Sequence, residues 1–204
     1  MRKVVVSTIM SLDGYVAGPG DDVMALPMDV FFDEHNLERQ RSADTLLVGG
    51  RSYLGFKAFW PEVAKDPAAS PALGTYPHAA EVAQETGRRN DELRKVVVSD
   101  SLTGADTAPW TDTTTIVRRS DAHSAVAALR SSSDGGDILV FGSRTLWNDL
   151  LAAGLVDELY VMVGPVALGG GTPAFSAAAG LTLLDVRRRE GSGNDLLRYA
   201  AGRS

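Results

Sequence analysis

The chain has 204 residues, 44% of them hydrophobic and 23% charged, which is the composition of an ordinary soluble globular protein. Twenty-six acidic and 20 basic residues give a net charge of −6, and the longest basic run is the three arginines at 187–189, which argues against a nucleic-acid-binding protein. No apolar run approaches the roughly 20 residues of a membrane-spanning helix, and the absence of cysteine excludes disulfides, cysteine nucleophiles and thiolate metal sites. We therefore expect a cytoplasmic protein, one domain over residues 1–204, without nucleic-acid or membrane partners. A metal site is not expected either, because the three histidines (His35, His78 and His123) show no helical pairing and suit surface or capping positions.

The first half of the chain predicts strands that alternate with helices. The apolar part of residues 4–9 is β-branched and interrupted by Ser7 and Thr8, and predicts a first strand rather than the signal peptide that the basic start superficially resembles. Glycines and aspartates at 10–23 then predict a long mobile loop. Leu26 and Pro27 predict the start of a helix, with Asp29 near its positive end. A second buried strand at 45–48 leads through glycine into another helix.

Further elements follow in the same alternation. Residues 60–77 are rich in proline and alanine and predict a surface excursion. A helix is expected at 82–93, and strands are expected at 95–99 and 113–117. Asp121 suits the cap of a helix that the polar stretch 131–136 ends.

The stretch from 137 to 155 gives the sharpest local prediction. Residues 138–141 carry no charge on either face and predict a buried parallel strand, which runs through Gly142 into an amphipathic helix with Trp147 and Leu150 on its apolar face. Gly154 suits the left-handed position after that helix, with Leu155 packing back on it.

The last quarter of the chain predicts strands only. A strand at 158–163, a glycine-rich loop and a closing antiparallel pair at 181–188 and 196–200 follow. Together with the first three quarters, this predicts an α/β fold with a mostly parallel sheet, helices on both faces and an antiparallel end.

Three strand ends carry residues that suit a dinucleotide. In an open α/β sheet, ligands bind beyond the carboxyl ends of the strands, and helix N-termini with a nearby arginine suit phosphate. Two of the three ends are glycine followed by arginine and a hydroxyl residue, although neither matches the Rossmann fingerprint or a Walker loop. The three ends are Gly49-Gly50-Arg51-Ser52, Ser99-Asp100 and Gly142-Ser143-Arg144-Thr145.

Beyond these patterns, the sequence resembles the dihydrofolate-reductase-like superfamily, and most closely its branch related to the reductase domain of bacterial riboflavin biosynthesis. The resemblance covers essentially the whole chain. It implies a three-layer sandwich with an eight- or nine-stranded sheet, NADPH as hydride donor, and a homodimer. The segments that carry it are STIMSLDGYVAG, ADTLLVGGRSY, KVVVSDSL and ILVFGSRTLWNDLLAAGLVDELYVMVGPVALGGGTPAF.

The resemblance also implies roles for the strand ends. The region 50–52 would hold the 2′-phosphate of the adenosine, Ser99 would lie near the adenine, and 142–145 would carry the pyrophosphate. Asp100 departs from this scheme because a carboxylate would repel the 2′-phosphate. Arg51 offers the compensating charge, so NADPH is expected, and NADH stays an alternative.

Two aspartates are expected on the substrate side. Asp13 lies in a loop that resembles the mobile segment over the nicotinamide, and could bind the substrate or serve only backbone hydrogen bonds. Asp29 matches the acid that holds the pterin ring in dihydrofolate reductases, and could instead be only a helix-start charge. Buried there, its carboxyl would have a raised pKa and could relay a proton.

The sequence thus predicts a reductase similar to 5-amino-6-(5-phosphoribosylamino)uracil reductase, acting on a pyrimidine- or pterin-like heterocycle. Dihydrofolate reductase activity is an alternative, as is a non-catalytic nucleotide- or flavin-binding protein. A deaminase domain of the kind joined to riboflavin-pathway reductases is not expected, since its zinc signature needs cysteine.

Overall fold

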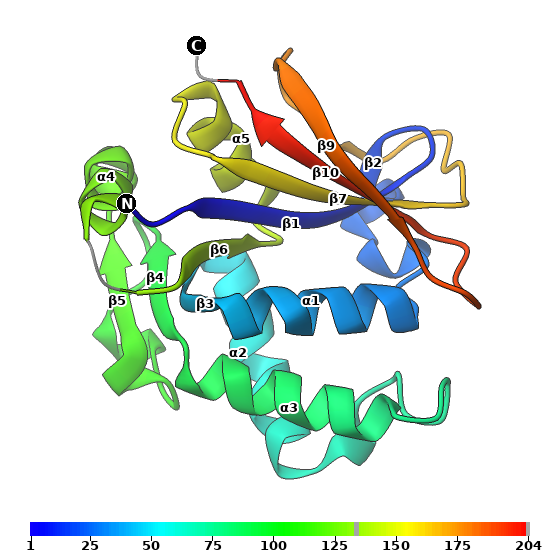
Figure 1. Cartoon of the computed structure of the whole chain (residues 1–204). Helices are drawn as coiled ribbons and strands as arrows, with labels where there is room; N and C mark the ends of the chain where they lie inside the picture. The colour runs from blue at the N-terminus through cyan, green and yellow to red at the C-terminus, as the bar shows by residue number, and fades with distance from the viewer. Residues whose placement is uncertain (133–134, 203–204) are drawn as a thin grey trace.

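A computed structural model describes residues 1–132 and 135–202 of the chain. An eight-stranded sheet crosses the molecule, and a separate two-stranded sheet lies beside the carboxyl end of its β1 strand (Figure 1). The main sheet contains β1 (Val4–Ser11), β3 (Ala43–Gly49), β4 (Arg94–Val98), β5 (Thr114–Val117), β6 (Asp137–Phe141), β7 (Glu158–Gly164), β9 (Leu181–Arg188) and β10 (Asp195–Ala201). The small sheet pairs β2 (Tyr15–Ala17) with β8 (Thr172–Pro173).

The strand order is β5-β4-β3-β6-β1-β7-β10-β9. The six strands from β5 to β7 are parallel, and β10 then runs antiparallel to both β7 and β9. This confirms the predicted mostly parallel sheet with an antiparallel end.

Within the described residues, five α-helices cover the two faces of the sheet: α1 (Val30–Ser42), α2 (Gly50–Lys65), α3 (Ala79–Glu92), α4 (Ala122–Ser131) and α5 (Arg144–Ala152). Alternation along β1 explains how one strand serves both layers, because successive side chains of a strand point to opposite faces. Val4 packs in one core cluster with Val126 of α4 and Trp147 of α5. Its neighbour Val5 packs on the other side with Phe31 of α1. Helices α1 and α3 lie on the opposite side of the sheet from α4 and α5 in Figure 1.

Helix α3 begins at Ala79 rather than at the predicted residue 82, and two other helix boundaries also differ from the prediction. Helix α1 begins at Val30, and Asp29 is its N-cap, so Leu26 and Pro27 lie before the helix. Helix α2 continues through the buried Pro61 to Lys65, although a surface excursion was predicted from residue 60. Tight packing against α3 sustains this last turn, since a Cβ added at Gly87 would lie 2.7 Å from the backbone nitrogen of Ala64.

Local predictions around α4 and α5 have mixed outcomes. Gly154 is left-handed with φ 66°, and Leu155 donates its N–H to the carbonyl of Leu150, as the Schellman pattern requires, which confirms the predicted helix end. Asp121 occupies the N-cap position of α4, but its side chain does not cap the helix. Within the predicted terminator at 131–136, residues 133 and 134 lie outside the described part of the chain.

The predicted mobile loop after β1 contains regular structure. It holds β2 and two short 3-10 helices, Pro19–Asp21 and Val23–Ala25. Among the helices that the structure describes, none combines the length and apolar character needed to cross a membrane.

Candidate functional site

The neighbouring strands β3 and β6 form a topological switch point, because the helices that follow them pack on opposite faces of the sheet; we call this position the crevice. The two strands are parallel neighbours, with Leu47 opposite Val140. The helix after β3 packs on one face of the sheet, through Tyr53 of α2. The helix after β6 packs on the other face, through Leu146 of α5. Ligands of open α/β sheets bind at such a switch point, outside the carboxyl ends of the strands.

Two serine contacts join the helix starts at this crevice. The Ser143 hydroxyl accepts the N–H of Gly49 at 2.9 Å, and the N–H of Ser143 donates to the Ser52 hydroxyl at 3.1 Å. Gly142 and Ser143 are both left-handed, with φ of 60° and 54°. A left-handed serine is strained and needs such contacts to hold it.

The starts of α2 and α5 are unusual for helix N-termini. Their N-cap residues, Gly49 and Ser143, make no side-chain hydrogen bond to the first turn, and neither first turn contains an acid. Arg51 and Arg144 occupy these turns instead. A cation near the positive end of a helix is unfavourable by about 0.3–1 kcal/mol. A bound anion interacts favourably with both the cation and the helix end. The arrangement therefore suits phosphate.

Ser99 lies at the third strand end that the sequence singled out. A Cβ added at Gly50 would lie 3.0 Å from the Ser99 hydroxyl, so β4 ends directly against the start of α2. The hydroxyl itself accepts the N–H of Leu102 at 3.1 Å and holds the following turn. Asp100 accepts the N–H of Arg119 at 3.0 Å and forms an ion pair with its side chain, so its carboxylate already has a partner.

Two loops, which together we call the lid, lie beside the helix starts of the crevice. The loops are residues 12–25 and 165–173, and they are joined by the β2–β8 pairing. Gly171 permits this pairing because a Cβ there would collide with the carbonyl of Ala17. Asp13 fastens the loops further, accepting the N–H groups of Leu168 and Gly169 at 3.0 and 2.7 Å. Hydrogen bonds from the Ser11 hydroxyl and from these two amides lower the pKa of Asp13 to about 2.

The lid contacts both arginines of the helix starts. Arg51 forms an ion pair with Asp21 at 3.0 Å, and Asp21 also accepts the Thr172 hydroxyl at 2.6 Å. Arg144 donates to the carbonyl of Pro173. Thr145 is exposed in the first turn of α5. The phosphate-binding positions that the sequence predicted therefore lie together beside the lid.

Asp29, the other predicted substrate acid, has structural partners. One carboxylate oxygen caps α1 by accepting the N–H of Phe31 at 3.0 Å, and the other accepts the Ser192 hydroxyl at 2.6 Å. The cap position explains why this acid precedes the helix rather than lying within it.

Asp33, one turn further along α1, is an acid that the sequence reading missed. Burial raises its pKa to about 6, against the opposing effect of a hydrogen bond that Tyr76 donates at 3.0 Å. The preceding residue, Phe32, faces Phe141 with ring centroids 6.1 Å apart, and Phe141 stacks on Phe56 of α2 at 5.5 Å. These three half-buried rings form an aromatic surface at the end of β6, next to Gly142.

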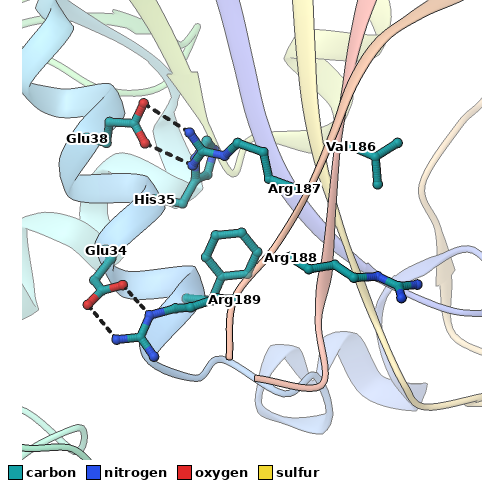
Figure 2. Close-up of a pocket in the computed structure, with 8 residues that line it drawn as sticks. Glu34, His35, Glu38, Val186, Arg187, Arg188 and Arg189 are labelled. Atoms are coloured by element: carbon teal, nitrogen blue, oxygen red, sulfur yellow. Dashed lines mark hydrogen bonds and ion pairs between the residues drawn. The ribbon is translucent and has the colours of Figure 1, made fainter. Parts of the chain in front are cut away.

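A hollow of about 500 Å³ lies between α1 and β9 (Figure 2). Two ion pairs span it, from Arg187 to Glu38 and from Arg189 to Glu34, at 2.9 and 2.6 Å. His35 lies at its inner side, only 2% exposed, so the prediction of a surface or capping position was wrong for this histidine. Burial lowers the pKa of His35 to about 3, which keeps the ring neutral. Because Arg187 and Arg189 are already paired to acids of α1, the two ion pairs hold α1 against the end of β9.

Sequence signals for the missed residues are weak. Asp21 contacts Arg51 and Thr172, which lie 30 and 151 residues away in the sequence. Asp33 contacts Tyr76, which lies 43 residues away. Phe32 and Phe56 read as ordinary core residues until β6 brings Phe141 between them. A pattern of single residues cannot report such contacts.

Comparison with known proteins identifies the family. The model of the RibD C-terminal domain matches residues 2–197, and the chain belongs to that family. Among curated proteins, the uncharacterized protein YyaP of Bacillus subtilis (strain 168) is 23% identical over 189 residues, which are 92% of this chain and 84% of YyaP.

Solved structures show the same fold. RibD of Acinetobacter baumannii is 18% identical with a TM-score of 0.65, over 99% of this chain and 58% of RibD, so the chain spans little more than half of that protein. A pyrimidine reductase-like protein from Corynebacterium diphtheriae is 16% identical with a TM-score of 0.62, over 100% of this chain and 93% of that one. These structures confirm the expected sandwich fold, and the family match confirms the expected branch.

Proposed function

We propose that this member of the RibD C-terminal domain family is a reductase that binds NADPH across the crevice between β3 and β6. The observation that carries the proposal is the pair of helix starts there. Both are uncapped, both place an arginine in the first turn, and they approach one point from opposite faces of the sheet. One anion-binding helix start is common in α/β proteins, whereas two at one switch point suit the two phosphate positions of a dinucleotide.

Different residues at the crevice would bind different parts of the cofactor. Gly142 to Thr145 would hold the pyrophosphate with the amides of the first turn of α5. Gly49 to Ser52 would hold the 2′-phosphate, with Arg51 as its cation, and Ser99 would lie beside the adenine. The pairing of Asp100 with Arg119 supports NADPH, because that carboxylate is neutralised rather than directed at the phosphate.

The substrate in this proposal is a pyrimidine- or pterin-like heterocycle, as for 5-amino-6-(5-phosphoribosylamino)uracil reductase. When bound, NADPH would supply a hydride to a polarised C=N or C=O carbon of the substrate. The aromatic surface of Phe32, Phe56 and Phe141 would hold the substrate ring. Asp33 would supply the accompanying proton, since its raised pKa keeps part of it protonated near neutral pH. Asp13 and Asp29 stay predicted substrate contacts, in addition to the structural bonds they make.

Titration of the protein with NADPH, followed by nicotinamide fluorescence, tests the proposal. We expect saturable binding at micromolar concentrations, weakened at least tenfold by Gly142→Val, because a β-branched residue opposes the left-handed backbone at φ 60°. Gly180→Val is the matched control, since nothing lies within 4 Å of a Cβ there. Circular dichroism would show that both variants fold.

Absence of binding at millimolar NADPH would overturn the proposal, and a yellow purified protein would favour the flavin alternative. Binding without turnover on any pyrimidine or pterin would favour a non-catalytic nucleotide-binding protein, and turnover of dihydrofolate alone would favour the dihydrofolate reductase alternative.

A further inference from the structure

The guanidinium of Arg51 already has a carboxylate partner within the chain. Its side chain is 91% exposed, and Asp21 of the lid reaches it at 3.0 Å. Asp21 therefore occupies, on this arginine, the place that a phosphate of the cofactor would take.

The position of Asp21 is fixed by its own backbone and by a second contact. Asp21 is left-handed, with φ 62°, and shares that conformation with only one other non-glycine residue in the described part of the chain, Ser143 at the same crevice. The Thr172 hydroxyl donates to its other carboxylate oxygen at 2.6 Å. Hydrogen bonds from Thr172 and Arg51 lower the pKa of Asp21, so the group is charged at neutral pH. Strained residues that are held in this way concentrate at functional sites.

We propose that Asp21 is a specificity-determining residue that competes with the 2′-phosphate of NADPH for Arg51, and so reduces the preference for NADPH over NADH. The inference rests on the proposed function, because it needs a dinucleotide at this crevice. When the 2′-phosphate binds, Asp21 must leave Arg51, and the lid segment that carries Asp21 and Thr172 must shift with it.

The competition arises because the Asp21 carboxylate and the 2′-phosphate are two different anions that bind the same cation, Arg51. A phosphate carries more charge than a carboxylate and can accept both N–H groups of a guanidinium edge, whereas Asp21 offers Arg51 one oxygen and Thr172 the other, so the phosphate displaces Asp21. The displaced carboxylate then lies near the negative 2′-phosphate and repels it, so NADPH binds more weakly than it would to Arg51 without Asp21. NADH has a 2′-hydroxyl at the same point, and a carboxylate can accept its hydrogen bond, as acidic residues do in NAD-binding domains.

Dissociation constants of NADPH and NADH, measured for wild type and Asp21→Asn at low ionic strength, test this. Asp21→Asn should strengthen NADPH binding about two- to fivefold, the range for loss of one exposed ion pair, and leave NADH unchanged or weaker. Asp22→Asn is the matched control, since it removes the same charge one residue away and asparagine can still cap the Val23–Ala25 turn. In an Arg51→Ala background, Asp21→Asn should no longer change the ratio of the two constants.

The outcomes separate this inference from the proposed function. If wild type binds neither dinucleotide, the proposed function fails and the inference fails with it. If NADPH binds but Asp21→Asn leaves the ratio unchanged or shifts it toward NADH, only the inference fails. An equal gain in Asp22→Asn would also overturn it, because the effect would then be one of net charge. Proteolysis of the lid with and without 2′-AMP gives a second readout: faster cleavage within residues 12–25 supports displacement of Asp21, and unchanged cleavage contradicts it.

Discussion

The ionisation of Asp33 in α1 is strongly coupled to folding. Its pKa is raised to about 6 by burial, whereas an aspartate in the unfolded chain titrates near 3.9. The folded state therefore binds the proton more tightly than the unfolded state. The stabilisation is fully present below about pH 4 and is lost as the pH rises to about 6, by up to about 3 kcal/mol.

Urea unfolding of Asp33→Asn at two pH values tests this. At pH 7.5 the variant should be about 1–3 kcal/mol more stable than wild type, because no charge is buried, and this difference should be smaller by about 2 kcal/mol at pH 4.5. The exposed Asp112→Asn is the control and should show no such pH dependence. An equal difference between Asp33→Asn and wild type at both pH values would contradict the assignment. If Asp33 donates the proton, turnover by Asp33→Asn should no longer fall as the pH rises through about 6.

At the residue scale, the sequence predicted contiguous motifs and missed distant partners. Gly49 to Ser52 and Gly142 to Thr145 could be predicted because each motif joins the end of a strand to the start of a helix in a few residues. Asp21 and Asp33 could not, because their surroundings are created by contacts far along the chain. The bonds that occupy Asp13 and Asp29 were foreseen only as an alternative.

At the scale of elements, the packing of α2 on α3 explains the largest error in the predicted helices. Pro61 reads as a helix breaker, since proline lacks an N–H and its ring opposes the preceding turn. Tertiary packing outweighs that preference here, because the close approach at Gly87 lets the last turn of α2 pack against α3. Propensity alone cannot report a contact of this kind.

Two alanine substitutions should therefore change stability in opposite directions. Gly87→Ala should destabilise the protein by about 1–2 kcal/mol, because the new methyl would lie 2.7–3.0 Å from atoms of Ala64. Gly55→Ala, on the exposed side of α2, meets nothing within 4 Å and should stabilise it by roughly 0.5–1 kcal/mol. Chemical denaturation of both variants measures this. Equal effects, or stabilisation by Gly87→Ala, would contradict the packing argument.

At the scale of the whole molecule, the elements and their alternation could be predicted, whereas the strand order could not. Parallel strands, helices on both faces and an antiparallel end follow from the order of apolar runs. The position of β6 between β3 and β1 depends on long-range pairing, and that position creates the crevice. The expected homodimer stays a prediction. Strand β9 forms one edge of the sheet and exposes Leu183, Leu184 and Val186.

In the proposed function, the starts of α2 and α5 bind one dinucleotide. Titration of ¹⁵N-labelled protein with NADPH, followed by the backbone amide signals, tests it most directly. We predict the largest shifts at Gly49 to Ser52 and at Gly142 to Thr145, with a second set in the lid around Asp21 and Thr172. Amide shifts confined to α1 and β9, around the hollow of Glu38 and Arg187, would contradict the account.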